Sequence, residues 1–325
     1  MRRILLISNS SGIYIKKELE KQGFIVDFFN DKPNEGFICK TLGRIDFIPY
    51  RYVLTTYYKR IYEKIKKYKY DIIFFIRGEY VTEAALDFFR NKMKESKFIL
   101  YMWDSVKNVK GIEGKWKFFD KVYSFDRMDC QNYKKEGVIF LPLFYKDEYR
   151  SQGRSSQEIY DFSFVGTAHG DRAKIVKSLK DKFEKCGKKF YIYLYSPHPL
   201  VFCFNKIFNK DYHGIKMSDI SFKMLPEKKV IKIYKQSKCI IDIENKHQTG
   251  LTIRTLEVMG LKRKLITTNT DIINYDFYHK ENIFIMDRKE MDIDLGFIEG
   301  NYHEINKEIY EKYSISGWTK NILGI

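Results

Sequence analysis

Residues 238–269 constrain the fold of this chain more than any other stretch of its sequence. Cys239–Ile243 is a short run rich in β-branched residues, which is typical of a buried strand. A polar loop, Glu244–Gly250, follows it, and Leu251–Gly260 then has apolar residues at helical spacing. Lys264–Thr268 returns to strand character. The order strand, loop, helix, strand predicts a unit of a parallel α/β sheet, with the loop at the carboxyl end of its first strand.

The start of this predicted helix has the features of an anion-binding site. Thr252 is the predicted N-cap, and a helix N-terminus offers free N–H groups and a positive dipole end to a phosphate or diphosphate. Arg254 lies in the first turn, where its guanidinium can clamp the same anion. Glu257 lies one turn later and can accept hydrogen bonds from a ribose. The two residues are three apart, however, so an exposed helical ion pair is an equally good interpretation.

The sequence TGLTIRTLEVMGLKRKLITTN, residues 249–269, resembles the donor-site segment of GT-B glycosyltransferases. In that superfamily a glycine-rich loop precedes a helix with a glutamate, then a small residue and a hydrophobic strand ending in Thr-Thr or Thr-Asn. The segment is most similar to the CgeB-like and the capsule or lipopolysaccharide glycosyltransferases of bacteria, in which an arginine shortly precedes the helix glutamate. The resemblance places Thr249, Gly250 and Leu251 at the loop, Glu257 at the helix glutamate, and Arg254 at the preceding arginine. With His247 of the same loop and Thr252 at the N-cap, these are the predicted donor-binding residues of this segment.

The same resemblance leaves the stereochemistry of transfer open. Retaining families with two glutamates carry them eight positions apart, which requires a glutamate at position 249. This chain has Thr249 there. Inversion and retention at the sugar are therefore both compatible with the sequence.

A second α/β half is predicted to begin near residue 161. The sequence FSFVGTAHGDR, residues 162–172, resembles the opening of the C-terminal half in the same families. Gly166 would let the backbone approach a ligand, and Arg172 would reach a phosphate, although an exposed helix start explains Arg172 equally well. His169 and His247 have no partner at metal-ligand spacing, so we expect no metal ion and no cofactor beyond the nucleotide-sugar substrate.

Acidic side chains follow three hydrophobic segments of the first half. Because the carboxyl ends of parallel strands face one crevice, these carboxylates are candidates for a catalytic base. Taken singly, each is more typical of a cap or turn. Asp104 is the first choice and Glu79 the second, and Asp126 completes the group.

These patterns predict two Rossmann-like domains facing across a cleft, residues 1–150 for the acceptor and 151–325 for the donor, joined by a polar linker at 146–159. The opening MRRILLISNSSG is expected to form the first strand and not a signal peptide. It contains no G-x-G-x-x-G fingerprint for a dinucleotide. In GT-B proteins the terminal helix often crosses back to the N-terminal domain, as the amphipathic tail 302–325 is expected to do.

The net charge of +17 favours an anionic partner: a phosphorylated substrate, an anionic lipid surface or nucleic acid. The segment 197–208 mixes apolar residues with lysine, and we read it as a buried or inter-domain helix in preference to a surface-contact element. Five cysteines without zinc or Cys-x-x-Cys spacing indicate a reduced, cytoplasmic protein, with contact at the inner membrane face left open.

We therefore predict metal-independent transfer of a sugar from a nucleotide-activated donor to an acceptor hydroxyl. The resemblance implies that the acceptor is a glycan or a lipid-linked sugar and that the setting is the synthesis of bacterial capsule, O-antigen or lipopolysaccharide. Two alternatives remain. A GT-B-type nucleotide-sugar epimerase would share the donor half but need no acceptor. A basic nucleic-acid-binding protein would explain the charge, but the chain has no helix-turn-helix, zinc-finger or RNP-like pattern.

Overall fold

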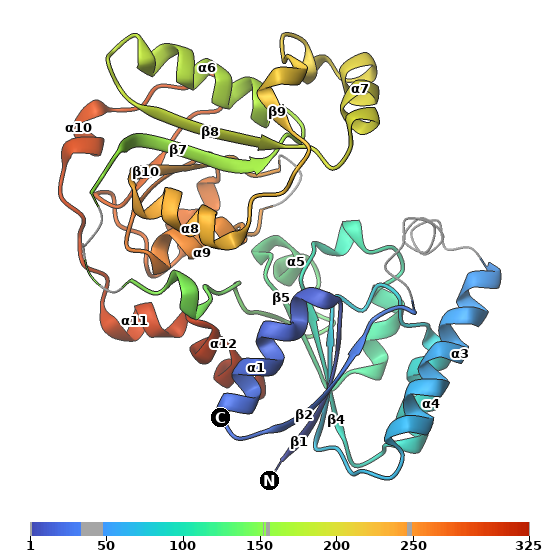
Figure 1. Cartoon of the computed structure of the whole chain (residues 1–325). Coiled ribbons are helices and arrows are strands. Elements are labelled where there is room, and N and C mark those ends of the chain that lie inside the picture. The colour runs from blue at the N-terminus through green and yellow to red at the C-terminus, as the bar shows by residue number, and fades with distance from the viewer. Residues whose placement is uncertain (1, 34–47, 152, 154–156, 246–248, 325) are drawn as a thin grey trace. The chain divides into compact units, whose positions relative to one another are not determined.

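The computed structural model describes residues 2–33, 48–151, 153, 157–245 and 249–324. The chain forms two compact units, each built on its own sheet (Figure 1). Unit 1 comprises Met1–Pro142 and Thr319–Ile325, and unit 2 comprises Leu143–Trp318. The two units are therefore joined by two chain crossings.

Unit 1 contains a six-stranded sheet in the order β2-β1-β3-β4-β5-β6, in which all neighbouring strands are parallel. Parallel strands require crossover connections, and helices supply most of them here. The strands are β1 (Arg3–Ser8), β2 (Ile25–Asn30), β3 (Ile72–Ile76), β4 (Lys97–Met102), β5 (Lys121–Ser124) and β6 (Val138–Phe140). The helices are α1 (Ile13–Lys21), α3 (Ile48–Ile65), α4 (Glu83–Lys92) and α5 (Arg127–Asn132), with short 3₁₀ turns η1 (Ser10–Gly12), η2 (Val106–Asn108) and η3 (Glu113–Phe118).

The core of unit 1 lies between this sheet and its helices. Every residue of β3 is buried, because helices cover both faces of a parallel sheet and remove the need for a polar alternation. Tyr58 of α3 packs against Phe75 of β3 and Phe89 of α4, with ring centroids 6.3 Å apart in both pairs. These aromatic contacts fix α3 and α4 against the sheet.

Unit 2 repeats the plan with the order β12-β11-β10-β7-β8-β9, again with parallel neighbours throughout. The strands are β7 (Tyr160–Thr167), β8 (Phe190–Tyr195), β9 (Ile220–Ser221), β10 (Ser237–Asp242), β11 (Lys264–Thr267) and β12 (Ile283–Ile285). The helices are α6 (Arg172–Glu184), α7 (Pro199–Phe208), α8 (Glu227–Lys235), α9 (Ile253–Gly260), α10 (Leu295–Glu299) and α11 (Lys307–Lys312). Four 3₁₀ turns complete it: η4 (Asp147–Tyr149), η5 (Lys210–Tyr212), η6 (Met217–Asp219) and η7 (Thr270–Asn274).

The last helix, α12 (Ile315–Leu323), begins in unit 2 and ends in unit 1. In unit 2 the fully buried ring of Trp318 packs against Phe144, with centroids 4.6 Å apart. In unit 1 the Gln22 amide, at the end of α1, donates a hydrogen bond of 2.7 Å to the Thr319 hydroxyl. The C-terminal helix therefore contacts the first helix of the chain, and the predicted crossing back is confirmed.

The strand-loop-helix-strand prediction for 238–269 is also confirmed, by β10, α9 and β11. The region 196–226 is more regular than its sequence suggested, since it contains α7 and the short strand β9. Among the described residues, no helix is long and apolar enough to span a bilayer.

Candidate functional site

The carboxyl ends of β7, β10, β11 and β12 meet along one edge of the unit 2 sheet, which we call the carboxyl edge. It is formed by residues 166–172, 242–245, 249–252, 267–269 and 286–288. Polar side chains tie these segments together. The Asn269 amide donates to the Thr249 carbonyl at 3.0 Å, and the Thr268 hydroxyl hydrogen-bonds to the Glu244 carboxylate. The loop that precedes α9 is thus attached to the end of the neighbouring strand.

Asp242, the last residue of β10, anchors the start of α9. Its carboxylate accepts hydrogen bonds from the hydroxyls of Thr252 at 2.6 Å and Thr255 at 2.8 Å. It also accepts one from the guanidinium of Arg254 at 2.7 Å. Asp242 is only 1% exposed, so this carboxylate is buried with a complete set of partners. Thr252 caps α9 as expected, through a hydrogen bond from the Thr255 amide.

The Arg254 guanidinium is directed into the protein. Its Nε donates to the Tyr234 hydroxyl at 3.1 Å, and its Nη2 donates to the Val165 carbonyl at 2.7 Å. The guanidinium also lies over the Phe164 ring, 5.0 Å from the centroid. Burial lowers the pKa of Arg254, but Tyr234 and Asp242 more than offset this and raise it above the ordinary value. Arg254 therefore joins β7, α8 and β10, and the exposed pair with Glu257 that spacing allowed is not formed.

The Arg254 guanidinium occupies the space that a side chain at position 166 would need. A Cβ at position 166 would lie 2.5 Å from Arg254 Nη2 and 3.1 Å from the Phe164 ring. The first distance is too short for a carbon atom, and the second would require the Phe164 ring to shift slightly. The glycine in FSFVG thus lets β7 approach the Arg254 guanidinium, a requirement that its sequence context did not reveal.

Arg172 differs from its neighbours because it forms no ion pair with any described residue. It begins α6, donates from Nε to the Ile243 carbonyl at 2.6 Å, and lies 3.3 Å from the Thr167 hydroxyl through Nη1. Burial lowers the pKa of Arg172, and the positive charges of Arg254 and Arg288 lower it further, against the opposing effect of Asp242 and Glu244. These two carboxylates offset the shift only partly, and both are paired with other arginines, Asp242 with Arg254 and Glu244 with Arg288.

Two charged residues of this edge were missed by the sequence reading. Arg288, just after β12, donates to the backbone carbonyl of Glu244 and lies 3.5 Å from its carboxylate. It also lies 3.8 Å from Asp171, while its Nε is buried without a hydrogen-bond partner among the described residues. No motif in the sequence around Arg288 or Glu244 points to this contact, because only the order of strands in the sheet brings the two residues together.

The remaining predicted donor residues lie in or beside the loop that enters α9. Gly250 and Leu251 are buried, and Thr249 is partly exposed. His247 lies outside the described residues. His169 is exposed at the end of β7 and belongs to no described cluster of metal-binding side chains.

Glu257 lies one turn after Arg254 on α9, beside Tyr149 of the 3₁₀ turn η4. Burial raises the pKa of Glu257 to about 7, and the opposing charges of Arg254 and Lys146 only partly offset this. Glu227 raises it further, and the Tyr149 hydroxyl lowers it. Lys146 itself is paired with Glu227. Glu257 is thus a partly buried carboxyl that changes its charge near neutral pH.

Unit 1 places both candidate bases beside one arginine. Arg77 Nη2 lies 3.2 Å from the Glu79 carboxylate and 3.3 Å from that of Asp104. Arg77 follows β3 with a φ of 73°, a left-handed conformation that costs a non-glycine residue about 1 kcal/mol. Strain of this kind is often found at functional sites. Asp126, in contrast, caps α5 by accepting from the Met128 amide.

This carboxylate pair lines a cavity of about 840 Å³ within unit 1. The cavity is bounded by α3, the start of α4 and the turns after β3 and β4. Burial raises the pKa of nearby Asp31, which Lys32 and Arg77 partly counter. The lining combines aromatic, acidic and basic side chains, including Tyr50, Tyr52, Tyr80, Glu79, Asp104 and Lys115.

Two Rossmann-like units with parallel sheets, together with the C-terminal helix, define a GT-B-like fold. No family model matches the sequence. No curated protein matches it significantly either.

Solved structures show the same fold at low identity. A glycosyltransferase from Rickettsia africae aligns with a TM-score of 0.58 at 14% identity, covering 99% of this chain and 93% of its own. Anabaena HepE, solved with UDP and glucose, gives 0.56 at 11%, covering 100% and 99%. The UDP-GlcNAc 2-epimerase of Neisseria meningitidis, bound to UDP-GlcNAc, gives 0.57 at 12%, covering 100% and 99%. The fold is therefore one that glycosyltransferases and nucleotide-sugar epimerases share.

Proposed function

We propose that this protein transfers a sugar from a nucleotide-activated donor to a hydroxyl of a glycan or lipid-linked acceptor. Capsule, O-antigen or lipopolysaccharide synthesis is the setting that the resemblance of residues 249–269 implies. Unit 2 would bind the donor and unit 1 the acceptor. The proposal rests on the carboxyl edge of unit 2 and on the structural neighbours solved with UDP or a UDP-sugar.

One observation carries the proposal most directly: Arg172 is a partly buried cation with no acidic partner among the described residues. Burial and the charges of Arg254 and Arg288 lower the pKa of Arg172, and Asp242 and Glu244 only partly offset this, so the repulsion on its guanidinium is incompletely compensated. A diphosphate would relieve that repulsion and accept charge-assisted hydrogen bonds. The N-termini of α6 and α9 both open at the same edge and favour an anion further.

In this mechanism the leaving nucleoside diphosphate gains negative charge as the glycosidic bond to the donor breaks. Arg172, the backbone of residues 249–252 and the helix ends would stabilise that charge, so no metal ion would be needed. The Arg254 guanidinium already donates hydrogen bonds to Asp242, Val165 and Tyr234. Its contribution to binding would be to hold Gly166 and the α9 start in place, with its charge acting at longer range. Glu257 would orient the nucleotide ribose.

In unit 1 an acceptor hydroxyl would enter the 840 Å³ cavity, where aromatic side chains suit a sugar ring. For inverting transfer, a carboxylate would remove the hydroxyl proton as the new bond forms. Asp104 fits this role better than Glu79 because its side chain is 31% exposed, against 9% for Glu79. Arg77, which is 3.2 Å from the Glu79 carboxylate and 3.3 Å from that of Asp104, would orient either side chain.

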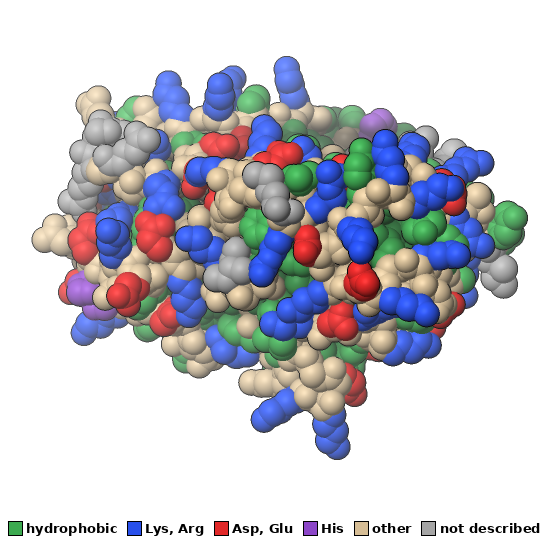
Figure 2. Space-filling model, turned by 90° about the horizontal axis from the view of Figure 1, so that it is seen from below, with side chains coloured by type: hydrophobic (Ala, Val, Ile, Leu, Met, Phe, Trp, Pro, Cys, Tyr) green, Lys and Arg blue, Asp and Glu red, His purple; other side chains and the backbone are tan. Residues whose placement is uncertain are grey.

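A nucleotide-sugar epimerase is the second candidate, favoured by the neighbours that are UDP-GlcNAc 2-epimerases. Such an enzyme would act on the donor alone. The large cavity in unit 1 has room for an acceptor, which an epimerase does not need, and this favours the transferase. Binding of nucleic acid is less favoured, since Lys and Arg are interspersed with Asp and Glu on the face seen in Figure 2.

The decisive experiment measures binding of UDP, GDP, CMP and dTDP and their sugars, with and without EDTA, by calorimetry. One nucleotide should bind the wild type, and Arg172→Ala should weaken it about 10- to 100-fold, the value of a hydrogen bond to a charged group. Lys185→Ala, which removes the same charge from the far end of α6, should bind normally. Absence of binding by every nucleotide at millimolar concentration would overturn the proposal.

Once the nucleotide is known, the two enzyme classes separate by product analysis. A transferase releases the nucleoside diphosphate in proportion to the added glycan or lipid-linked acceptor. An epimerase changes the sugar configuration of the donor without any acceptor. Conversion of the donor alone, with no dependence on acceptor, would favour the second candidate.

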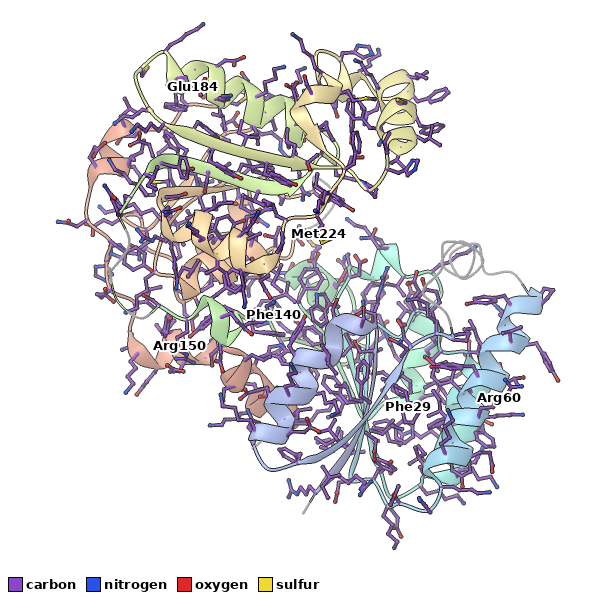
Figure 3. All side chains as sticks on the ribbon, in the orientation of Figure 1. Phe29, Arg60, Phe140, Arg150, Glu184 and Met224 are labelled. Carbon is purple, nitrogen blue, oxygen red and sulfur yellow. The ribbon has the colours of Figure 1, made fainter. Side chains whose placement is uncertain are left out.

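We also propose that α7 provides peripheral contact with an anionic membrane face. Unit 2 leaves its apolar side chains uncovered: Leu200, Ile207 and Phe208 are each more than 70% exposed, and Phe204 is 62% exposed. Side chains of α7 project away from the unit 2 sheet, and Met224, also exposed, lies on the segment between β9 and α8 (Figure 3). The exposed lysines Lys206, Lys210, Lys216 and Lys223 accompany this surface, which suits anionic headgroups.

A further inference from the structure

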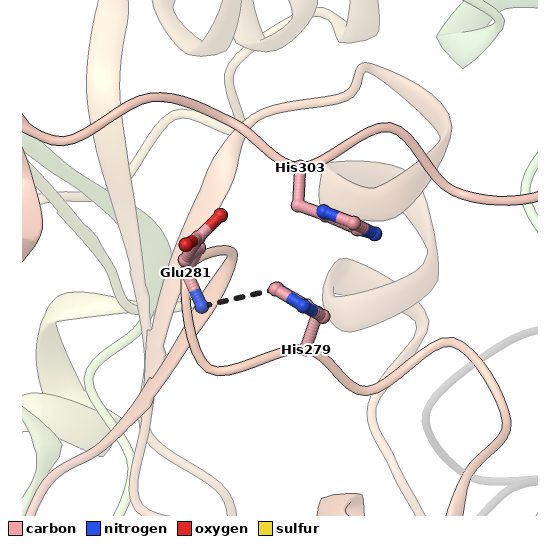
Figure 4. A group of neighbouring side chains, drawn as sticks. All are labelled: His279, Glu281 and His303. Carbon is pink, nitrogen blue, oxygen red and sulfur yellow. Dashed lines mark hydrogen bonds between the residues drawn. The ribbon is translucent and has the colours of Figure 1, made fainter.

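Two histidines and one glutamate gather at the edge of the unit 2 sheet opposite the carboxyl edge. His279 and Glu281 come just before β12, at its amino-terminal end, and His303 lies between α10 and α11. One ligand atom from each of the three side chains can be chosen so that all lie within 4.8 Å of one another (Figure 4). The two imidazole rings are stacked, with centroids 3.7 Å apart and planes inclined by 10°.

The backbone that carries these side chains is fixed by a buried asparagine. Asn282, which is 2% exposed, donates from its amide to the His303 carbonyl at 2.8 Å and accepts from the His303 amide at 2.7 Å. The backbone amides of Asn282 and Ile283 both donate to the His279 carbonyl at 2.9 Å. Asn282 thus holds the backbone of His303, 21 residues away, so that the His303 ring stacks on that of His279. The two imidazoles are therefore positioned in advance of any ligand, which an ordinary surface histidine does not need.

The orientation of His279 leaves a nitrogen for a ligand. Its Nδ1 faces the Glu281 backbone amide at 3.4 Å, so Nε2 is the atom that can bind an ion (Figure 4). A zinc ion about 2 Å from each donor holds its ligands about 3–4 Å apart. Rotation of the exposed Glu281 and His303 side chains closes the remaining gap, because neither is packed in the core.

We propose that His279, Glu281 and His303 bind one divalent transition-metal ion of the zinc type, with water completing its coordination. Two imidazoles and one carboxylate favour zinc, copper, nickel or cobalt over magnesium and calcium, which prefer oxygen ligands. The ion links the chain that leads into α11 to the edge strand β12. It lies at the opposite edge from Arg172, so it serves unit 2 as a structural clip and takes no part in nucleotide binding.

The test is calorimetric titration of Zn²⁺ into the full chain after EDTA treatment, with Co²⁺ as a spectroscopic probe. We expect one equivalent of Zn²⁺ to bind. His279→Ala and His303→Ala should each weaken binding about tenfold or more, because each removes one of three protein ligands. His213→Ala, a lone exposed histidine of the same unit, is the matched control and should bind as the wild type does.

Binding by cysteine is the competing outcome, since Cys186 is exposed and free. Co²⁺ held by imidazole and carboxylate gives ligand-field bands without a thiolate charge-transfer band. A thiolate band, equal Zn²⁺ affinity in both histidine variants, or no binding by the wild type would each overturn the proposal. Nucleotide binding should be unchanged in the histidine variants, so failure here is separate from failure of the proposed transfer function.

Discussion

Arg254 and Asp242 form a buried ion pair, 2.7 Å between guanidinium and carboxylate, that ties the last residue of β10 to the first turn of α9. The arginine is 14% exposed at its side chain and the aspartate 1%. Removing one member of such a pair leaves an uncompensated buried charge, which costs about 3–5 kcal/mol. We therefore regard the pair as the structural support of the carboxyl edge.

Asp242→Ala is expected to lower the thermal midpoint of unit 2 strongly, because Arg254, Thr252 and Thr255 all lose their acceptor. Asp292→Ala breaks the exposed pair with Lys182 and should change stability by less than about 1 kcal/mol. Differential scanning calorimetry of both variants checks this. Equal midpoints for the two variants would contradict the assigned role of Asp242.

The raised pKa of Glu257 leads us to expect that the stability of the protein falls as pH rises toward 7. Its folded-state pKa of about 7 is above the ordinary value of 4.5, so the folded protein binds the extra proton between these two values. That stabilisation is fully present below about pH 4.5, where both states are protonated, and it is lost progressively as pH rises from 4.5 toward 7. As pH rises through 7 the burial of a charged carboxylate costs on the order of 3 kcal/mol. Glu257→Gln should therefore gain stability relative to the wild type between pH 5 and pH 8.

Thermal unfolding of both proteins across that range gives the measurement, and subtracting one curve from the other cancels the remaining titrating groups. A difference that stays constant with pH would show that Glu257 is ionised throughout. If Glu257 also orients the ribose, the Gln variant should bind nucleotide more weakly although it is more stable at pH 8.

Asp104→Asn should lower kcat of acceptor-dependent transfer about 100- to 10,000-fold, the usual value of a general base. Glu79→Gln should have a smaller effect, because the Glu79 carboxylate is the less exposed of the two. Donor affinity should stay unchanged in both, since they line the unit 1 cavity. Asp126→Asn serves as the control because Asp126 caps α5. A full loss with Glu79→Gln and normal rates with Asp104→Asn would reverse the assignment.

Contact of α7 with lipid predicts selective binding to anionic vesicles. Replacing Phe204 and Ile207 together by serine should lower the vesicle-bound fraction about tenfold or more, since each buried side chain contributes about 1.5–3 kcal/mol. Met128→Ser removes an exposed apolar side chain from unit 1 and should leave binding unchanged. Vesicle flotation with anionic and neutral lipid measures the effect. Self-association of the wild type without any vesicle binding would assign the surface to a second copy of the chain.

Several features could be predicted from the sequence because they depend on local chemistry. Buried parallel strands are continuous apolar runs, so β3 and β10 were recognisable from their residues. The cap at Thr252, the start of α9 and the resemblance of residues 249–269 to GT-B donor segments are likewise local. Together they gave the α/β class, the two sheets and the segment at the carboxyl edge.

The partners of these residues were decided only by the tertiary structure. Arg254 meets the Val165 carbonyl 89 positions away because β7 lies beside β10, and that strand order is not written in either segment. Tertiary structure likewise decides three other features: the contact of Arg288 with Glu244, the hydrogen bonds between Asn282 and His303, and the exposure of α7. Periodicity states which side chains are apolar, whereas sheet order and packing decide which charged groups meet and which apolar face remains uncovered.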